Sequence, residues 1–320
     1  MTTKKLLSLL ILSASMSVSL YAQTLTLGHA MSTDSAVHQG MLVFAERVKQ
    51  RSNGELTIHI SPNAEQGSER VLTEKVITGQ LALAKINGSL AESYAPVFKT
   101  ISIPYLFRNT AHMRTFLHSH TAQEMLDSTT DKGFRGLTFY DSGSRSFYSN
   151  KPIKTPQDMQ GLTVRVPKSP TMLEMVELLG AKAIAMPYTK VYQGLKEGVV
   201  DSAENNLSSL VEMKHANVVK YYSIDQHTMT PDILIISEKV WRTLSFKQQT
   251  VLKLAAIDSL EQEIKLWDKT EKQNIAKAQS MGIHFVSVDK HAFKEKMRPI
   301  MEKARNNPDI APYIEQIQNL

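Results

Sequence analysis

The sequence predicts an α/β protein built from two lobes, and three observations lead to this fold class. Apolar segments with strand-like and helix-like spacing alternate from residue 24 to about residue 200, which is the rhythm of βαβ units. About 300 residues follow an N-terminal targeting segment, a length near the limit for one hydrophobic core. One long segment also lacks glycine and proline. We therefore expect mixed, mostly parallel sheets and a helix that crosses both lobes.

The first elements follow one another with clear boundaries. Residues 25–27 predict a strand, and apolar residues at helical spacing continue over 37–48 until Asn53 and Gly54 end the helix. A strand over 57–60, a helix over 68–77 and a strand over 81–86 come next. A helix from Ala111 and a strand over 137–140 extend the alternation.

Three helix starts carry strong capping signals. Thr155 and Ser169 each precede a proline, and Ser245 with Gln248 forms a capping box. The segment 246–281 that follows Ser245 would reach ~54 Å as a single helix, at about 1.5 Å per residue. That length exceeds one small domain, so this helix is expected to cross both lobes. Two helices with an unmarked break are the alternative.

The N-terminus has the features of a secretory signal peptide. Lys4 and Lys5 precede an uncharged apolar run over 6–20, and Ala22 offers a cleavage point. An uncleaved membrane anchor is the alternative, but the run is short of the ~20 residues that span a bilayer. We therefore expect residues 1–22 to be removed and the protein to be periplasmic.

Composition and motifs exclude several classes of protein. The chain has no cysteine and a net charge of +6, without the basic blocks that nucleic-acid binding requires. No phosphate-binding glycine loop, zinc-protease motif or nucleophile elbow is present. His112, His118 and His120 would project in different directions from one helix and are interpreted as surface histidines. We expect no catalytic residue, no metal and no cofactor.

Two arginines are candidates for anion binding. Arg165 lies within an apolar strand, where Leu162, Val164 and Val166 share the opposite face. An arginine on a strand built for burial needs an anionic partner, either an internal carboxylate or a ligand. Arg145 follows the strand over 137–140, and such strand ends face the binding crevice of α/β sheets. The residues alone leave both interpretations open.

The chain resembles the substrate-binding subunits of TRAP (tripartite ATP-independent periplasmic) transporters, the DctP-like family. The resemblance covers essentially the whole chain after residue 22, and its central part lies between Gly161 and Asn206. The matching segments read Gly-Leu-Thr-Val-Arg-Val-Pro (161–167), Met-Pro-Tyr (186–188), Val-Tyr-Gln-Gly-Leu (191–195), Gly-Val-Val-Asp (198–201), Ala-Glu-Asn (203–205), Tyr-Asp-Ser-Gly-Ser-Arg-Ser-Phe (140–147), Ile-Pro-Tyr-Leu-Phe (103–107) and His-Thr-Met-Thr-Pro (227–231).

This resemblance implies a two-lobed periplasmic solute-binding protein that catalyses nothing. It implies that Arg165 clamps a ligand carboxylate, that Arg145 supports the clamp, and that Asn205 and Tyr188 line the pocket. Segment 246–281 matches the family's long interdomain helix. The resemblance further implies lobe I over 23–142 and 231–270, and lobe II over 143–230 and 271–320. Hinges are expected at 141–144 and 229–232, with closure around the ligand.

The ligand's other end is expected to meet His29, Glu69 and Asn87, although each also fits ordinary loop chemistry. The segments 140–147 and 203–206 are similar to members that bind hexuronates, with C4-dicarboxylates as the next choice. The implied partners are the small and large permease subunits in the membrane. A receptor for a chemoreceptor or sensor kinase is one alternative, and a periplasmic sugar-acid enzyme is another.

Overall fold

The computed structural model describes residues 22–320, and its strands form two sheets, one in each lobe. The predicted signal peptide over 1–22 lies outside the described residues except for Ala22. The first sheet has the order β2 (Leu56–Ser61), β1 (Gln23–Gly28), β3 (Leu83–Asn87), β10 (Asp232–Ser237) and β4 (Phe134–Tyr140). β1 runs parallel to β2 and β3, whereas β10 is antiparallel to β3 and β4.

The second sheet is also mixed. Its order is β11 (His284–Val286), β9 (Tyr221–Thr228), β5 (Arg145–Ser149), β8 (Ser202–Asn205), β6 (Thr163–Val166) and β7 (Lys182–Ala185). β5 is antiparallel to both of its neighbours, and the other three pairings are parallel. The predicted α/β class with mixed sheets in two lobes is therefore confirmed.

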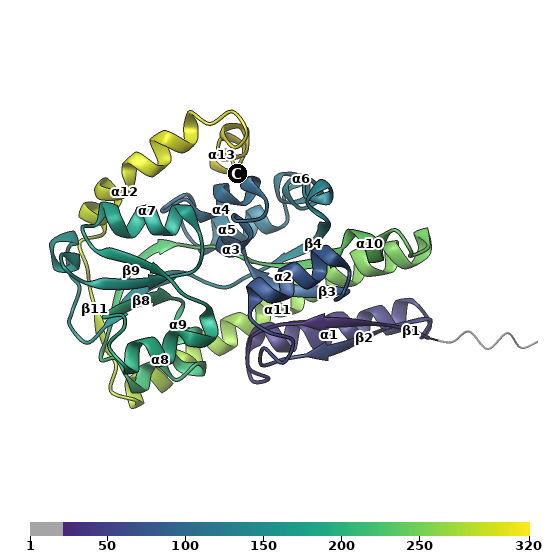
Figure 1. The fold of residues 1–320 in the computed structure, drawn as a ribbon, viewed down its shortest axis with the longest axis horizontal. Helices are drawn as coiled ribbons and strands as arrows, with labels where there is room; N and C mark the ends of the chain where they lie inside the picture. The colour runs from purple at the N-terminus through teal and green to yellow at the C-terminus, as the bar shows by residue number, and fades with distance from the viewer. Residues whose placement is uncertain (1–21) are drawn as a thin grey trace, which may run out of the picture.

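Helices cover both faces of each sheet (Figure 1). Before the first crossing between the lobes they are α1 (Ala36–Arg51), α2 (Glu69–Thr78), α3 (Gly88–Ala91), α4 (Lys99–Ser102), α5 (Thr110–Leu117) and α6 (His120–Asp127). After it come α7 (Pro170–Leu178), α8 (Val191–Lys196), α9 (Leu207–Glu212), α10 (Glu238–Trp241), α11 (Phe246–Ser280), α12 (Lys290–Arg305) and α13 (Ala311–Gln318). Among the described residues, no helix is long and apolar enough to span a membrane.

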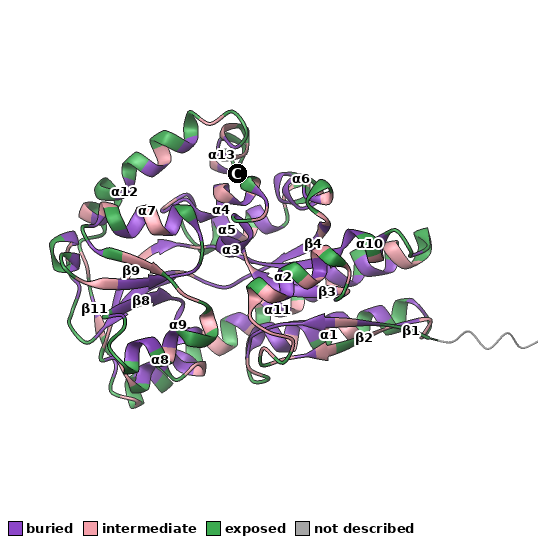
Figure 2. Ribbon diagram, viewed as in Figure 1, coloured by how far each residue is buried: buried purple, intermediate pink, exposed green. Residues whose placement is uncertain are grey.

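The alternation of side chains along β10 shows how the first sheet is buried. Ile233 and Ile235 pack into one apolar cluster with α2, α5 and α6, while Leu234 and Ile236 pack into another with α1 and α11. Successive side chains of a strand point to opposite faces, so a strand covered on both sides is apolar throughout. The buried sheets between half-exposed helices are visible in Figure 2.

α11 is a single helix of 35 residues, so the alternative of two shorter helices is wrong. The Ser245 hydroxyl accepts from the Gln248 amide, and the Gln248 side chain accepts from the Ser245 amide, which is the predicted capping box. α11 packs against α1 in the first lobe and against α9 in the second. The chain therefore has one rigid element common to both lobes. By contrast, the cap at Thr155 starts only a short 3-10 helix, Pro156–Met159.

Two further segments connect the lobes, and they contact each other. Residues 141–144 lead from β4 to β5, and residues 229–231 lead from β9 back to β10. The Ser142 hydroxyl donates to the Thr230 carbonyl at 2.6 Å. The C-terminal helix α13 returns to the first lobe, where the Ile317 carbonyl lies 2.8 Å from Nε2 of His112 in α5. We therefore group α13 with the first lobe, although the sequence placed 271–320 in lobe II.

Candidate ligand-binding site

A cavity lies between the lobes, where the carboxyl ends of the central strands meet the N-terminal part of α9. The first lobe contributes Met31, Ser35, Glu69, Lys85, Asn87 and Asp232, and the second contributes Arg145, Arg165, Tyr188, Asn205, Asn206, Ser208, Ser209 and Glu212. Trp267 of α11 also lines it. This position follows the general rule for ligands in α/β sheets. Six of the seven residues predicted from the sequence line this cavity.

Arg165 is the strongest indication that the cavity binds an anion. It lies on β6 between the fully buried Val164 and Val166, and it is itself only 3% exposed. Nε and one terminal nitrogen donate to the Met186 carbonyl at 3.0 and 2.8 Å. No carboxylate within residues 22–320 forms an ion pair with it. Burial lowers the pKa of Arg165 despite the attraction of Glu204. A buried guanidinium with one neutral acceptor is typical of a site for an anion.

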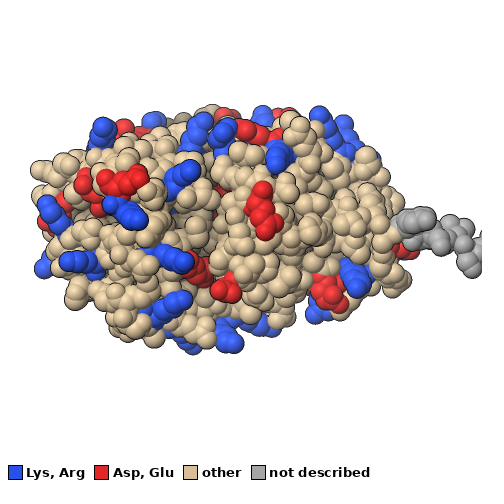
Figure 3. All heavy atoms as spheres, turned by 60° about the horizontal axis from the view of Figure 1, so that its bottom comes forward, with Lys and Arg blue, Asp and Glu red and all other residues tan. Residues whose placement is uncertain are grey.

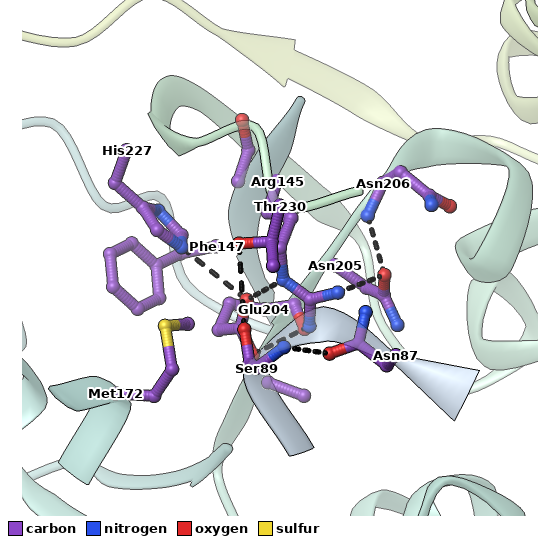
Figure 4. A network of polar contacts seen from close by, with 12 residues as sticks. Asn87, Ser89, Arg145, Phe147, Met172, Glu204, Asn205, Asn206, His227 and Thr230 are labelled. Carbon is purple, nitrogen blue, oxygen red and sulfur yellow. Dashed lines mark hydrogen bonds and ion pairs between the residues drawn. The ribbon is translucent and has the colours of Figure 1, made fainter. Parts of the chain in front are cut away.

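Arg145 is neutralised within the protein. Its Nε and a terminal nitrogen bind the two carboxylate oxygens of Glu204 at 2.6 and 2.8 Å, a bidentate pair. The remaining terminal nitrogen donates to Oδ1 of Asn205 at 2.9 Å. Figure 4 shows this chain of contacts from Glu204 through Arg145 to Asn205. The internal ion pair considered for Arg165 thus occurs at Arg145, which orients Asn205 and supports the site.

His227 and Asp225 form a second buried ion pair next to Glu204. His227 lies 3.3 Å from Glu204 through Nε2 and 2.7 Å from Asp225 through Nδ1. Burial disfavours the charged forms, but Asp225 and Glu204 raise the pKa of His227 to about 9. Arg145 likewise outweighs burial and lowers the pKa of Glu204 to about 2. The positive charges of Arg145 and His227 therefore balance the negative charges of Glu204 and Asp225. Arg165 remains as the positive charge without an ionic partner on the second-lobe wall of the cavity.

Asn205 and Tyr188 present hydrogen-bond donors to the cavity. Oδ1 of Asn205 accepts from Arg145 and from the Asn206 amide, so its Nδ2 is left to donate to a ligand. The Tyr188 hydroxyl is buried and makes no hydrogen bond of normal geometry within residues 22–320. Burial raises the pKa of Tyr188 and outweighs the opposing effect of Ser209, so the hydroxyl stays protonated. Both groups suit the oxygens of an anionic ligand.

The opposite wall contains Glu69 and Asn87, together with two residues that the sequence analysis missed. Lys85 on β3 is 2% exposed, and its Nζ lies 3.0 Å from Glu69 and 2.8 Å from Asp232. Asn87 donates to the other oxygen of Asp232 at 3.1 Å and accepts from the Ser89 amide. These four side chains form a fixed polar surface that faces Arg165 across the cavity.

His29 does not line the cavity. Its ring is fully buried, where Nδ1 accepts from the Met31 amide at 3.1 Å and Nε2 lies 2.9 Å from Nδ1 of His38. Burial, and next the charge of Lys85, lower the pKa of His29 to about 3, so the ring is neutral. The expected contact of His29 with a ligand is therefore not supported. Its structural role is to hold the loop that carries Met31.

Three charged residues of the cavity were not predicted from the sequence, and they differ in whether the sequence contained a signal for them. Lys85 gave the same signal as Arg165, a cation inside an apolar strand. Asp232 is an acidic residue at the start of the otherwise largely apolar, buried strand β10, which is a similar signal. Glu212 ends α9 without any local signal. The described residues contain no group of three or more potential metal ligands, and His112 is buried against α13, contrary to the predicted surface position.

The charged side chains outside the cavity are dispersed. On the face shown in Figure 3, lysines and arginines alternate with aspartates and glutamates, without a large patch of one sign. The net positive charge of the chain therefore does not create a basic surface on this face. The positive charge that can recognise an anion is the guanidinium of Arg165 inside the cavity.

Comparison with known proteins shows which kind of protein this chain is similar to. The chain is 34% identical over 285 residues to the uncharacterised protein YiiZ of Salmonella typhimurium, with 88% of this chain and 87% of the relative covered. A TRAP solute-binding protein from a Bradyrhizobium species, crystallised with galacturonate, is 33% identical with a TM-score of 0.90 and covers 93% of this chain and 100% of its own. A TRAP solute-binding protein from Anaerococcus prevotii, crystallised with glucuronate, is 31% identical with a TM-score of 0.90 over 92% and 97%.

The family model for bacterial extracellular solute-binding proteins, family 7, matches residues 27–307, which is nearly all of the chain after its first 26 residues. That match includes every residue of the cavity. The resemblance derived from the sequence is therefore confirmed, and the chain belongs to family 7 of the bacterial extracellular solute-binding proteins, the substrate-binding subunits of TRAP transporters.

Proposed function

We propose that this protein binds a hexuronate, such as D-galacturonate or D-glucuronate, in the cavity between its lobes and delivers it to a TRAP permease. One observation carries the proposal: Arg165 is a buried guanidinium that lacks a carboxylate partner within the described residues. The oxygens of a ligand carboxylate would accept hydrogen bonds from the Arg165 guanidinium. Asn205 and Tyr188 would be further donors. The hexuronates bound in the two similar crystal structures support the choice of acid.

The proposal also includes place and partners. The signal sequence at the N-terminus and the extracellular family support export to the periplasm, with removal of residues 1–22. The small and large membrane subunits of the permease would receive the ligand there. Recognition without catalysis is expected, because the matching family consists of solute-binding proteins and because Glu69, Asp232 and Glu204 are each paired with a cation.

The test begins with the full-length chain expressed and recovered from the periplasmic fraction. Its N-terminus is determined by mass spectrometry, and Gln23 is the expected first residue. Thermal-shift and calorimetric titrations then compare D-galacturonate and D-glucuronate with D-galactose and with galacturonate methyl ester. Both acids should raise the melting temperature, because a ligand that binds only the native state stabilises it. A larger shift with a neutral compound would show that the ligand assignment is wrong.

A further inference from the structure

The charges that line the cavity are divided unequally between its two walls. On the wall of the second lobe, Arg145 is paired with Glu204, so Arg165 provides the single unpaired positive charge. On the wall of the first lobe, the ammonium of Lys85 lies between the carboxylates of Glu69 and Asp232. One cation thus faces two anions there, and that wall keeps a net negative charge.

The negative charge of the first wall is held in place by burial and hydrogen bonds. Lys85 and Asp232 have side chains that are 2% and 6% exposed, and Glu69 is 11% exposed. One oxygen of Asp232 binds Lys85 and the other accepts from Asn87. In Glu69, Oε1 binds Lys85, and Oε2 has no hydrogen-bond partner within residues 22–320. Glu69 therefore presents a free acceptor to the cavity.

A third acid, Glu212, lies at the end of α9 on the second-lobe side of the cavity, opposite Glu69 and Asp232. It lines the cavity, and its Oε2 is buried without a hydrogen-bond partner within residues 22–320. Burial raises the pKa of Glu212 to about 7, although Asn274 and Lys277 oppose the shift. Its carboxyl group also suits a hydroxyl group and repels a carboxylate once it is ionised.

We propose that Glu69 and Asp232 act as a charge filter that admits acids with one carboxylate and several hydroxyl groups and rejects acids with a second carboxylate. The inference rests on the proposed function, because it assumes that one carboxylate already occupies Arg165. A hydroxyl group of the ligand can donate to the free oxygen of Glu69 and accept the third hydrogen of Lys85. A second carboxylate only accepts, and it would lie beside two fixed anions in a site shielded from water.

The experiment compares pairs of acids that differ by one carboxylate. Calorimetry at neutral pH measures D-galacturonate against galactarate, the open-chain acid with the same configuration at C2–C5 and a second carboxylate at C1. D-galactonate, an open-chain acid with a single carboxylate, shows how much of any difference comes from loss of the ring. The native protein should bind galacturonate at least about 100-fold more tightly. Glu69→Gln keeps Oε1 as an acceptor for Lys85 and removes the charge, so the ratio should narrow at least tenfold. Glu74→Gln on the same helix, outside the cavity, is the matched control and should leave the ratio unchanged.

The outcomes separate this inference from the proposed function. Equal binding of galacturonate and galactarate, or an unchanged ratio in Glu69→Gln, overturns the filter while hexuronate binding stands. Failure of both hexuronates contradicts the proposed function, and the filter is then judged with D-gluconate against D-glucarate. Tighter binding of the dicarboxylate, or binding of neither acid, overturns it. If Glu69→Gln does not fold, Asp232→Asn provides the same comparison.

Discussion

The carboxylate of Glu92 accepts a hydrogen bond of 2.5 Å from the Ser169 hydroxyl, and this contact joins the two lobes. Glu92 follows α3 in the first lobe, and Ser169 is the N-cap of α7 in the second. The other oxygen of Glu92 accepts from the Thr171 hydroxyl at 2.7 Å. A buried carboxylate at the N-terminus of α7 also interacts favourably with the helix dipole. The lobes are thus held together by a polar contact outside the ligand cavity.

Replacement of Glu92 is expected to favour an open form. Glu92→Ala removes the acceptor for Ser169 and Thr171, so closure around the ligand should depend on ligand contacts alone. Small-angle scattering should show a larger radius of gyration for the unliganded variant than for the native protein, and ligand should restore the compact form. Ligand affinity should fall about tenfold, or about 1.4 kcal/mol.

Glu177→Ala is the control for this variant, because Glu177 is exposed and lies on the same helix α7. It should leave both the radius of gyration and the affinity unchanged. An identical radius for native protein and Glu92→Ala, with and without ligand, would show that Glu92 does not govern closure.

The clamp at Arg165 predicts a large loss of affinity on substitution. Arg165→Ala removes the partner of a desolvated carboxylate, which costs roughly 2–5 kcal/mol, or about 30- to 4,000-fold in affinity. Arg165→Lys should be nearly as harmful, because an ammonium cannot reproduce the planar fork. Isothermal titration with D-galacturonate measures both. Arg242→Ala, an exposed arginine on the surface, is the control. Native affinity in either Arg165 variant would remove this residue from the site.

The cluster of His227 with Asp225 and Glu204 predicts a loss of stability at alkaline pH. The pKa of His227 is raised from 6.5 to about 9, so the protonated ring stabilises the fold fully below about pH 6.5. This contribution is lost as the pH rises through about 9, and it amounts to at most about 3 kcal/mol. The melting temperature should therefore fall between pH 6.5 and 9.5.

Nuclear magnetic resonance of the His227 ring distinguishes this cause from other titrations. Its resonances should titrate near pH 9. A midpoint for His227 near pH 6.5 would contradict the charged pair. Glu204 acts at the other extreme: its pKa is lowered to about 2, so its stabilisation is lost as the pH falls below about 4.5.

The sequence predicted the elements whose signals are local. The capping box at Ser245 and the absence of glycine and proline indicated α11 correctly, because helix starts and breaks depend on nearby residues. Arg165 was found since its charge contradicted an apolar strand. Lys85 gave the same signal and was overlooked.

Other features depend on contacts that no local pattern records. His29 stands at the end of a strand, as a binding residue would, but its ring contacts His38 and is not part of the cavity wall. Glu212 reaches the cavity only because α9 is placed beside α11. The return of α13 to the first lobe results from its contacts with α6 and from the hydrogen bond between the Ile317 carbonyl and His112, about 200 residues earlier in the chain. Tertiary packing decides each of these.

Gly143 lies in the crossing between the lobes, at a position where we expect no side chain to be tolerated. Its φ is +62°, and a Cβ atom would lie 2.9 Å from the indole ring of Trp267, which lines the cavity. Gly161 has a similar φ of +76° but no atom within 4 Å of the same position. Both alanine variants should lose about 1 kcal/mol through the left-handed backbone conformation.

Only Gly143→Ala should also displace Trp267, so it should be less stable than Gly161→Ala and bind ligand more weakly. Urea unfolding measures the free energy of each variant, and calorimetry measures its affinity. Since the backbone strain is common to both, the difference between them isolates the contact with the indole ring. Equal stability and equal affinity in the two variants would show that the crossing can move away from α11 without disturbing the cavity.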